Sequence, residues 1–182
     1  MAAKWDIIFV MLGTNDARDI GSGGPEHWPR STCDSATAAD LGKCSYANNY
    51  TALLNTIKGL GRNASGPEVH IMIPPALMQQ GAYGMNQTII NTVFPRLIPI
   101  IGEAHKDQVK SVIDVYTGMG GVPAPGWKTA LPPKCVLNSP WPPCRWYCDQ
   151  QSCSPGQCHP NDVGCAHLAE VVYKGCKNCW NA

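Results

Sequence analysis

Three short apolar runs, separated by segments of helical periodicity, set the pattern of the chain. They are residues 7–12, which are apolar throughout, and residues 69–73 and 109–115, which include polar positions. Each run is rich in β-branched residues, which is typical of strands buried in a parallel sheet. Between the first two runs, apolar residues at helical spacing predict an amphipathic helix that ends at Gly59 or Gly61.

A second helical pattern covers residues 86–105, but Pro95 and Pro99 fall inside it. Proline in a helix interior removes a hydrogen bond and clashes with the preceding turn. We therefore expect either a kink or a late start for this helix.

A last helix, capped by Asn161 or Asp162, is expected to run through Tyr173. Its inner stripe is predicted to hold Val163, Ala166, Ala169, Val172 and Tyr173. The order strand, helix, strand, helix, strand predicts right-handed crossovers and a parallel sheet with helices on its faces. The 182 residues fit one such domain, and we predict an α/β fold of three layers, α/β/α.

Residues 118–160 form a cysteine-rich loop region in which the periodic pattern is absent and prolines are frequent. The chain has ten cysteines, an even and dense set that favours disulfides and an oxidising, secretory compartment. Cys33 and Cys44 are placed to close a small loop. The alternative is zinc, for which the two-residue spacer of Cys176 and Cys179 is suited. Further candidate ligands are Cys148, Cys153, Cys158 and Cys165.

Charge and hydropathy exclude several function classes. The net charge of +1 gives no indication of nucleic acid or of an anionic membrane as partner. No apolar stretch approaches the length that spans a bilayer. The apolar run that follows Met1 is too short for a signal peptide. Because a secreted protein needs one, we expect that the beginning of the protein is missing.

Small polar residues follow the first strand where it ends, as Gly13, Thr14, Asn15 and Asp16. Ligands of open α/β sheets bind outside the carboxyl ends of the strands. This segment is therefore where we expect chemistry, and the alternative is that Asn15 only caps the turn.

The first strand with its Gly-x-Asn-Asp end resembles the third conserved block of the SGNH, or GDSL-type, esterase and lipase superfamily. Residues 158–164, Cys-His-Pro-Asn-Asp-Val-Gly, resemble the last block, which carries the catalytic histidine. The resemblance implies a flavodoxin-like α/β/α fold and hydrolysis of carboxylic or acetyl esters, including esters of carbohydrates, by serine acyl transfer. It implies no metal and no cofactor.

The resemblance assigns roles to the matched residues. His159 is the general base, and histidine is the usual base near neutral pH. Asn15 donates to the oxyanion, while Gly13 and Asp16 support the turn. The alternatives for His159 are a structural loop histidine and a metal ligand.

The chain departs from the superfamily at two positions. No Gly-Asp-Ser block occurs, so the nucleophile is missing and we expect a domain that is incomplete at its N-terminus and inactive by itself. Gly156 stands where the acid of the triad is expected. Asp149 is a candidate substitute, and a backbone carbonyl that orients His159 is another. A nucleophilic pair of Cys158 and His159 is a further alternative.

Two function classes stand beside the esterase. One is a catalytically inactive, cysteine-stapled binding domain on a hydrolase scaffold, and the other is a zinc-binding module. The expected partner is a small-molecule or carbohydrate ester, with no nucleic acid and no membrane span. The sequence leaves the oligomeric state open.

Overall fold

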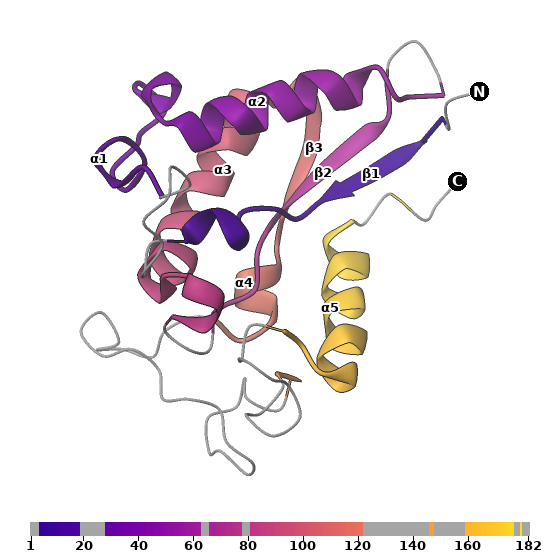
Figure 1. Cartoon of the computed structure of the whole chain (residues 1–182). Helices are drawn as coiled ribbons and strands as arrows, with labels where there is room; N and C mark the ends of the chain where they lie inside the picture. The colour runs from indigo at the N-terminus through magenta and orange to yellow at the C-terminus, as the bar shows by residue number, and fades with distance from the viewer. Residues whose placement is uncertain are drawn as a thin grey trace.

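The computed structural model describes residues 4–18, 28–62, 66–77, 81–121, 146–147, 159–176 and 179. Three parallel strands form one sheet in the order β1-β2-β3 (Figure 1). They are β1 (Ile7–Val10), β2 (Glu68–Ile73) and β3 (Val109–Asp114). The predicted α/β class and the parallel sheet are therefore confirmed.

Three long helices accompany the sheet. They are α2 (Ser45–Lys58) between β1 and β2, α3 (Phe94–Ala104) between β2 and β3, and α5 (Asp162–Gly175). The shorter elements are η1 (Asn15–Ala17), α1 (Arg30–Cys33), η2 (Leu41–Lys43), η3 (Ala82–Gly84), the π-helical turn η4 (Ile89–Val93) and α4 (Val115–Gly118). None of the helices described is both long enough and apolar enough to cross a bilayer.

The strand register separates the two helix layers. Ile71 and Val112 are partners in the sheet and lie against Gly102 of α3. Ile113 is the next residue along β3, and it lies against Gly175 of α5. Since successive side chains of a strand point to opposite faces, α3 and α5 cover opposite faces of the sheet. Figure 1 shows α2 and α5 on opposite sides as well.

The first strand is less buried than its sequence predicts. It ends at Val10, and Leu12 lies beyond it with 49% of its surface exposed. Ile7, Ile8 and Phe9 are half-buried. Within the described sheet β1 has a neighbour on one side only, so its faces are less covered than those of β2. The prediction of a strand buried on both faces was wrong for β1.

One of the two helix boundaries set by glycine or proline follows the expected signal. α2 ends at Lys58 with Gly59 as its C-cap, as predicted. The segment expected as a helix over 86–105 is helical from residue 87, and the π-helical turn η4 leads directly into α3 at Phe94. Pro95 lies in the first turn of α3 and Pro99 lies inside it, so the prolines accompany a π-helical turn, a usual cause of a kink, and not a late start.

The last helix is capped by Asn161, which was one of the two predicted caps. Its predicted inner stripe was wrong in part, because Val163 and Tyr173 are 64% and 57% exposed. Val172 packs on the core as predicted, together with Leu168 and Val171, which were not predicted. The inner stripe of α5 is therefore rotated relative to the prediction.

An aromatic cluster holds the loops at the carboxyl end of β1 onto α2 and α3. The Phe94 ring lies 5.3 Å from that of Trp28 and 5.4 Å from that of Tyr46, between ring centroids. Phe94 is completely buried. Cys33 and Cys44 form a disulfide beside this cluster, as predicted.

Candidate functional site

The turn after β1 depends on a glycine. Gly13 has a φ of 124°, which only glycine adopts without strain. A Cβ at this position would lie 2.7 Å from the Tyr46 hydroxyl and 3.0 Å from the Phe94 ring. The Tyr46 hydroxyl donates to the Leu12 carbonyl at 3.2 Å, and the Gly13 carbonyl accepts from Ala17 at 3.1 Å. The turn therefore packs closely on the aromatic cluster and sets the start of η1, where Asn15 lies.

Replacement of Gly13 by alanine is expected to destabilise the fold by about 1–3 kcal/mol, because the new methyl group is strained at this φ and overlaps two rings. Gly42 is the matched control, since nothing lies within 4 Å of a Cβ there. Urea unfolding of both variants measures the difference. Equal, small effects at the two glycines would contradict this description of the turn.

Asp16 follows Asn15 in η1, and its electrostatics are set by partial burial. Burial raises the pKa of the Asp16 carboxyl, and a hydrogen bond from its own backbone amide offsets part of that rise. Burial also raises the pKa of Tyr46 well above its usual value, with smaller contributions from Tyr50 and Asp16. Asp16 therefore lies near the aromatic cluster beneath the turn.

His159 lies immediately before the capped start of α5. The Asn161 side chain accepts from the Gly164 amide at 2.8 Å and donates to the Tyr147 carbonyl at 3.0 Å. The Asn161 amide donates to the Trp146 carbonyl at 3.0 Å. These bonds fix the backbone two residues after His159, and Pro160 restricts the peptide between them.

Tyr83 lies beside His159 and has unusual backbone angles. Its φ of 52° and ψ of 27° are left-handed, which is rare for an aromatic residue. Its ring meets the His159 ring edge-on at 5.7 Å between centroids. Strained residues cluster at functional sites, so the backbone conformation and the ring contact together point to a role here.

The two residues that the sequence singled out lie on one cavity. Asn15 and His159 both line a cavity of about 580 Å³ outside the carboxyl ends of the strands. Asn15 comes from the segment after β1, and His159 from the segment before α5. The remaining lining residues are Met11, Thr14, Arg18, Pro75, Tyr83, Met85, Pro160, Cys165 and Leu168. The structure therefore brings Asn15 and His159 together, although 144 positions of sequence numbering separate them (159 − 15).

The cavity combines polar donors with apolar walls. Its polar side chains include a carboxamide, an imidazole and the guanidinium of Arg18, which suit an ester or carboxylate oxygen. No serine lines it among the described residues. Cys165 lines it as a free, exposed cysteine. Sequence reasoning missed Arg18 and Tyr83, and for Tyr83 the flanking Gly81 and Gly84 were the available signal.

Several predicted site residues cannot be placed. Asp149, Gly156 and Cys158 lie outside the described residues, as does most of the cysteine-rich region 118–160. The identity of a triad acid therefore stays a prediction.

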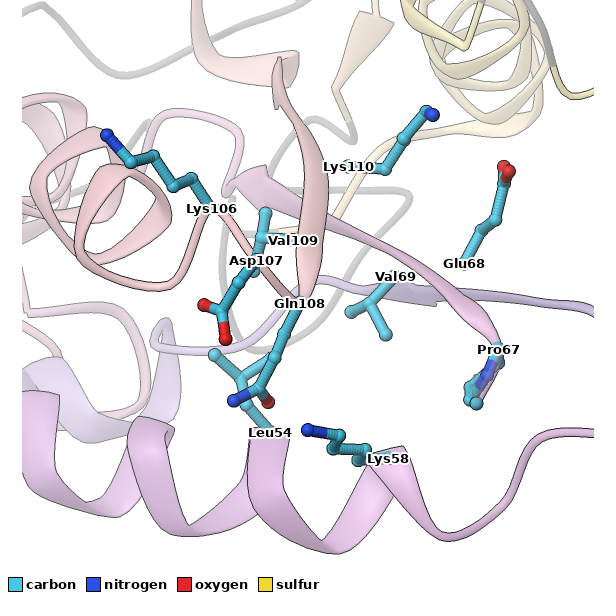
Figure 2. A pocket seen from close by; sticks show the side chains of 11 residues that line it. Leu54, Lys58, Pro67, Glu68, Val69, Lys106, Asp107, Gln108, Val109 and Lys110 are labelled. Carbon is cyan, nitrogen blue, oxygen red and sulfur yellow. The ribbon is translucent and has the colours of Figure 1, made fainter. Parts of the chain in front are cut away.

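A second cavity, of about 390 Å³, lies at the opposite ends of the strands. Figure 2 shows Lys58, Asp107 and Gln108 around its opening, while Glu68 and Lys110 extend to the other side of the strands. Its lining mixes both charges, and the described residues that form it include neither histidine nor cysteine. Because ligands of open α/β sheets bind at the carboxyl ends, the cavity with Asn15 and His159 is the better candidate.

Replacing Tyr83 by glycine is expected to leave stability unchanged or to raise it by up to about 1 kcal/mol, because the backbone strain is removed. The same change removes the ring that contacts His159 and should weaken ligand binding in the cavity. Tyr83→Phe is the control, since it keeps the ring. Thermal unfolding and ligand titration of both variants test this, and a clear loss of stability in Tyr83→Gly would contradict it.

Comparison of the chain with family models, with curated proteins and with solved structures finds no match.

Proposed function

We propose that the cavity is the acyl-transfer site of an SGNH-type ester hydrolase. The observation that carries the proposal is that Asn15 and His159 line one cavity at the carboxyl end of the sheet. These are the two residues to which the sequence resemblance assigns the oxyanion donor and the general base.

The chemistry follows from the two side chains. His159 takes the proton of the attacking hydroxyl as that oxygen bonds to the ester carbonyl carbon, and then gives the proton to the leaving alcohol. The Asn15 carboxamide donates a hydrogen bond to the oxyanion of the tetrahedral intermediate, which is worth about 3–4 kcal/mol for a comparable donor. Water then releases the acyl group by the same steps.

The walls of the cavity suit a short acyl group or a sugar ester. Met11, Pro75, Met85 and Leu168 supply apolar surface, and Arg18 supplies a cation for a polar substituent. The volume of about 580 Å³ falls within the range of small-molecule sites. This supports a small-molecule or carbohydrate ester as substrate.

The serine nucleophile belongs to a Gly-Asp-Ser block that this sequence does not contain. We therefore expect activity only in a polypeptide that also carries that block. Expression of the chain alone, and of a longer polypeptide that includes any in-frame coding sequence upstream of Met1, tests this. Fluorophosphonate labelling and hydrolysis of p-nitrophenyl acetate are the readouts.

The expected result is labelling and hydrolysis by the longer polypeptide and neither by the 182-residue chain. In the longer polypeptide, Asn15→Ala should lower kcat by about 10²- to 10³-fold. A folded longer polypeptide with the Gly-Asp-Ser block but without hydrolysis would overturn the proposal.

The second candidate is a binding domain on the same scaffold, favoured by the lack of a serine among the described lining residues. A genuine start codon at Met1, with a stop codon upstream, would favour this candidate. The disulfide between Cys33 and Cys44 supports an oxidising, extracellular or secretory location for either function.

A further inference from the structure

Three side chains with metal-binding atoms meet beneath the C-terminal end of α5. His70 lies on β2, Cys176 follows the last residue of α5, and Cys179 lies three positions further. Their exposed fractions are 3%, 2% and 8%, so the cluster is buried. The ligand atoms of the three residues all lie within 4.8 Å of one another.

The separations of the ligand atoms suit a single ion. His70 Nε2 lies 3.4 Å from Cys176 Sγ and 3.3 Å from Cys179 Sγ. Nitrogen and sulfur ligands at ordinary distances from a tetrahedral zinc ion lie roughly 3.6 Å apart. The two nitrogen–sulfur separations are therefore within a few tenths of an ångström of those in a zinc coordination shell, whereas the two sulfurs, which are bonded to each other here, move apart when the disulfide is reduced.

The His70 ring is held in the orientation that coordination needs. Ser111, its partner in the sheet register, places its hydroxyl oxygen 2.8 Å from Nδ1. The Phe9 ring stacks on the imidazole at 5.2 Å between centroids. Metal-binding histidines are oriented by such a partner on the second ring nitrogen, which leaves the first nitrogen for the ion.

A fourth ligand is available from the same strand. Glu68 lies two residues before His70 and so on the same face of β2. Its carboxylate oxygen Oε2 is 3.9 Å from His70 Nε2. Figure 2 shows the Glu68 side chain on the side of the strands away from Leu54 and Lys58 of α2.

We propose that His70, Cys176 and Cys179 form a zinc site in the reduced protein, with the Glu68 carboxylate as fourth ligand. Zinc is the metal that fits, because it accepts sulfur, nitrogen and carboxylate oxygen in one tetrahedral shell. The two-residue spacer between the cysteines is typical of such sites. Cobalt(II), which adopts the same geometry, serves as a spectroscopic substitute.

In the structure Cys176 and Cys179 are joined by a disulfide, which is the metal-free state of the site. Reduction by a dithiol transfers two electrons and two protons to the cysteine sulfurs, while the dithiol becomes a disulfide. Zinc then replaces the two thiol protons, which are released to water. Zinc and the disulfide therefore exclude one another.

The site would anchor a helix that buries little surface by itself. Within α5 only Gly164 is buried. The cluster ties the residue after its last turn to the central strand of the described sheet. α5 is about 20 Å long, so this site lies at the other end of the helix from Cys165 and the cavity. Metal binding and ester hydrolysis can therefore be tested separately.

The test uses the 182-residue chain, reduced anaerobically with a water-soluble phosphine, which becomes its oxide by taking an oxygen atom from water. Titration with cobalt(II) and then zinc is followed by the thiolate-to-cobalt absorption and by native mass spectrometry. We expect the wild-type chain to bind one ion. In His70→Gln and in the Cys176→Ser/Cys179→Ser double variant, the affinity for that ion should be at least about 100-fold weaker. The double variant Cys33→Ser/Cys44→Ser is the matched control and should keep that ion.

Zinc-edge X-ray absorption of the wild-type protein decides the question even if a variant does not fold. A shell of two sulfur and two nitrogen or oxygen ligands is expected. A shell of sulfur alone, no ion bound after reduction, or an ion that His70→Gln leaves unchanged would each overturn the proposal.

Discussion

Replacement of His159 by alanine is expected to lower kcat for ester hydrolysis on the order of 10⁶-fold in a polypeptide that carries the serine nucleophile. Without the imidazole, none of the other described residues that line the cavity is a base that could take the proton of the attacking hydroxyl and return it to the leaving alcohol. Residual rate enhancement of roughly 10³ to 10⁴ over water should remain, because the oxyanion donor and the binding surface are intact.

His105→Ala is the matched control for this prediction. His105 follows α3 and its Nε2 lies 2.8 Å from the Thr51 hydroxyl, with no part in the cavity. Steady-state hydrolysis of p-nitrophenyl acetate measures both variants. A loss of less than about tenfold in His159→Ala, with the fold intact, would remove His159 from the mechanism.

Phe94→Ala is expected to cost about 3–5 kcal/mol of the free energy of unfolding. The ring is completely buried at the first position of α3, where it contacts Trp28 and Tyr46. A domain of this size has a total stability of roughly 5–15 kcal/mol, so the variant should be close to unfolding at 37 °C.

The same substitution should also leave the turn at Gly13 less tightly packed, because the Phe94 ring lies against that turn. Val163→Ala, at an exposed position of α5, is the control and should change stability by no more than about 0.5 kcal/mol. Urea unfolding measures both. A loss below about 1 kcal/mol in Phe94→Ala would contradict the role given to the aromatic cluster.

The elements that the sequence predicts best are those whose local signal and tertiary environment agree. β2 is central in the described sheet, and its short, mainly apolar run identified it correctly. Gly59 ends α2, and Cys33 pairs with Cys44. In each case the deciding interaction is close in sequence or depends only on burial.

The predictions fail where distant packing decides. The sequence of β1 predicts a fully buried strand. How many neighbours a strand has in the sheet cannot be deduced from its own residues. The inner stripe of α5 is misplaced because a weakly amphipathic helix offers several faces. Gly81 and Gly84 indicate a turn around Tyr83, but they do not indicate that Tyr83 itself has a left-handed backbone.

The residues of the candidate site show the same contrast between those that the sequence predicts and those that it does not. Asn15 and His159 were found because each lies at the end of an element with a recognisable sequence. Arg18 lines the cavity without any pattern around it. His70 lies 106 positions before Cys176, and the packing of α5 on the sheet brings the two together.

The central claim is that Asn15 and His159 act on the same bound group. Nitrogen-15 NMR of the 182-residue chain, titrated with butyrate as a carboxylate product, tests it most directly. We predict that the Asn15 side-chain NH₂ and the His159 ring nitrogens shift together and give one Kd. Shifts in only one of the two residues, or two different Kd values, would contradict the claim.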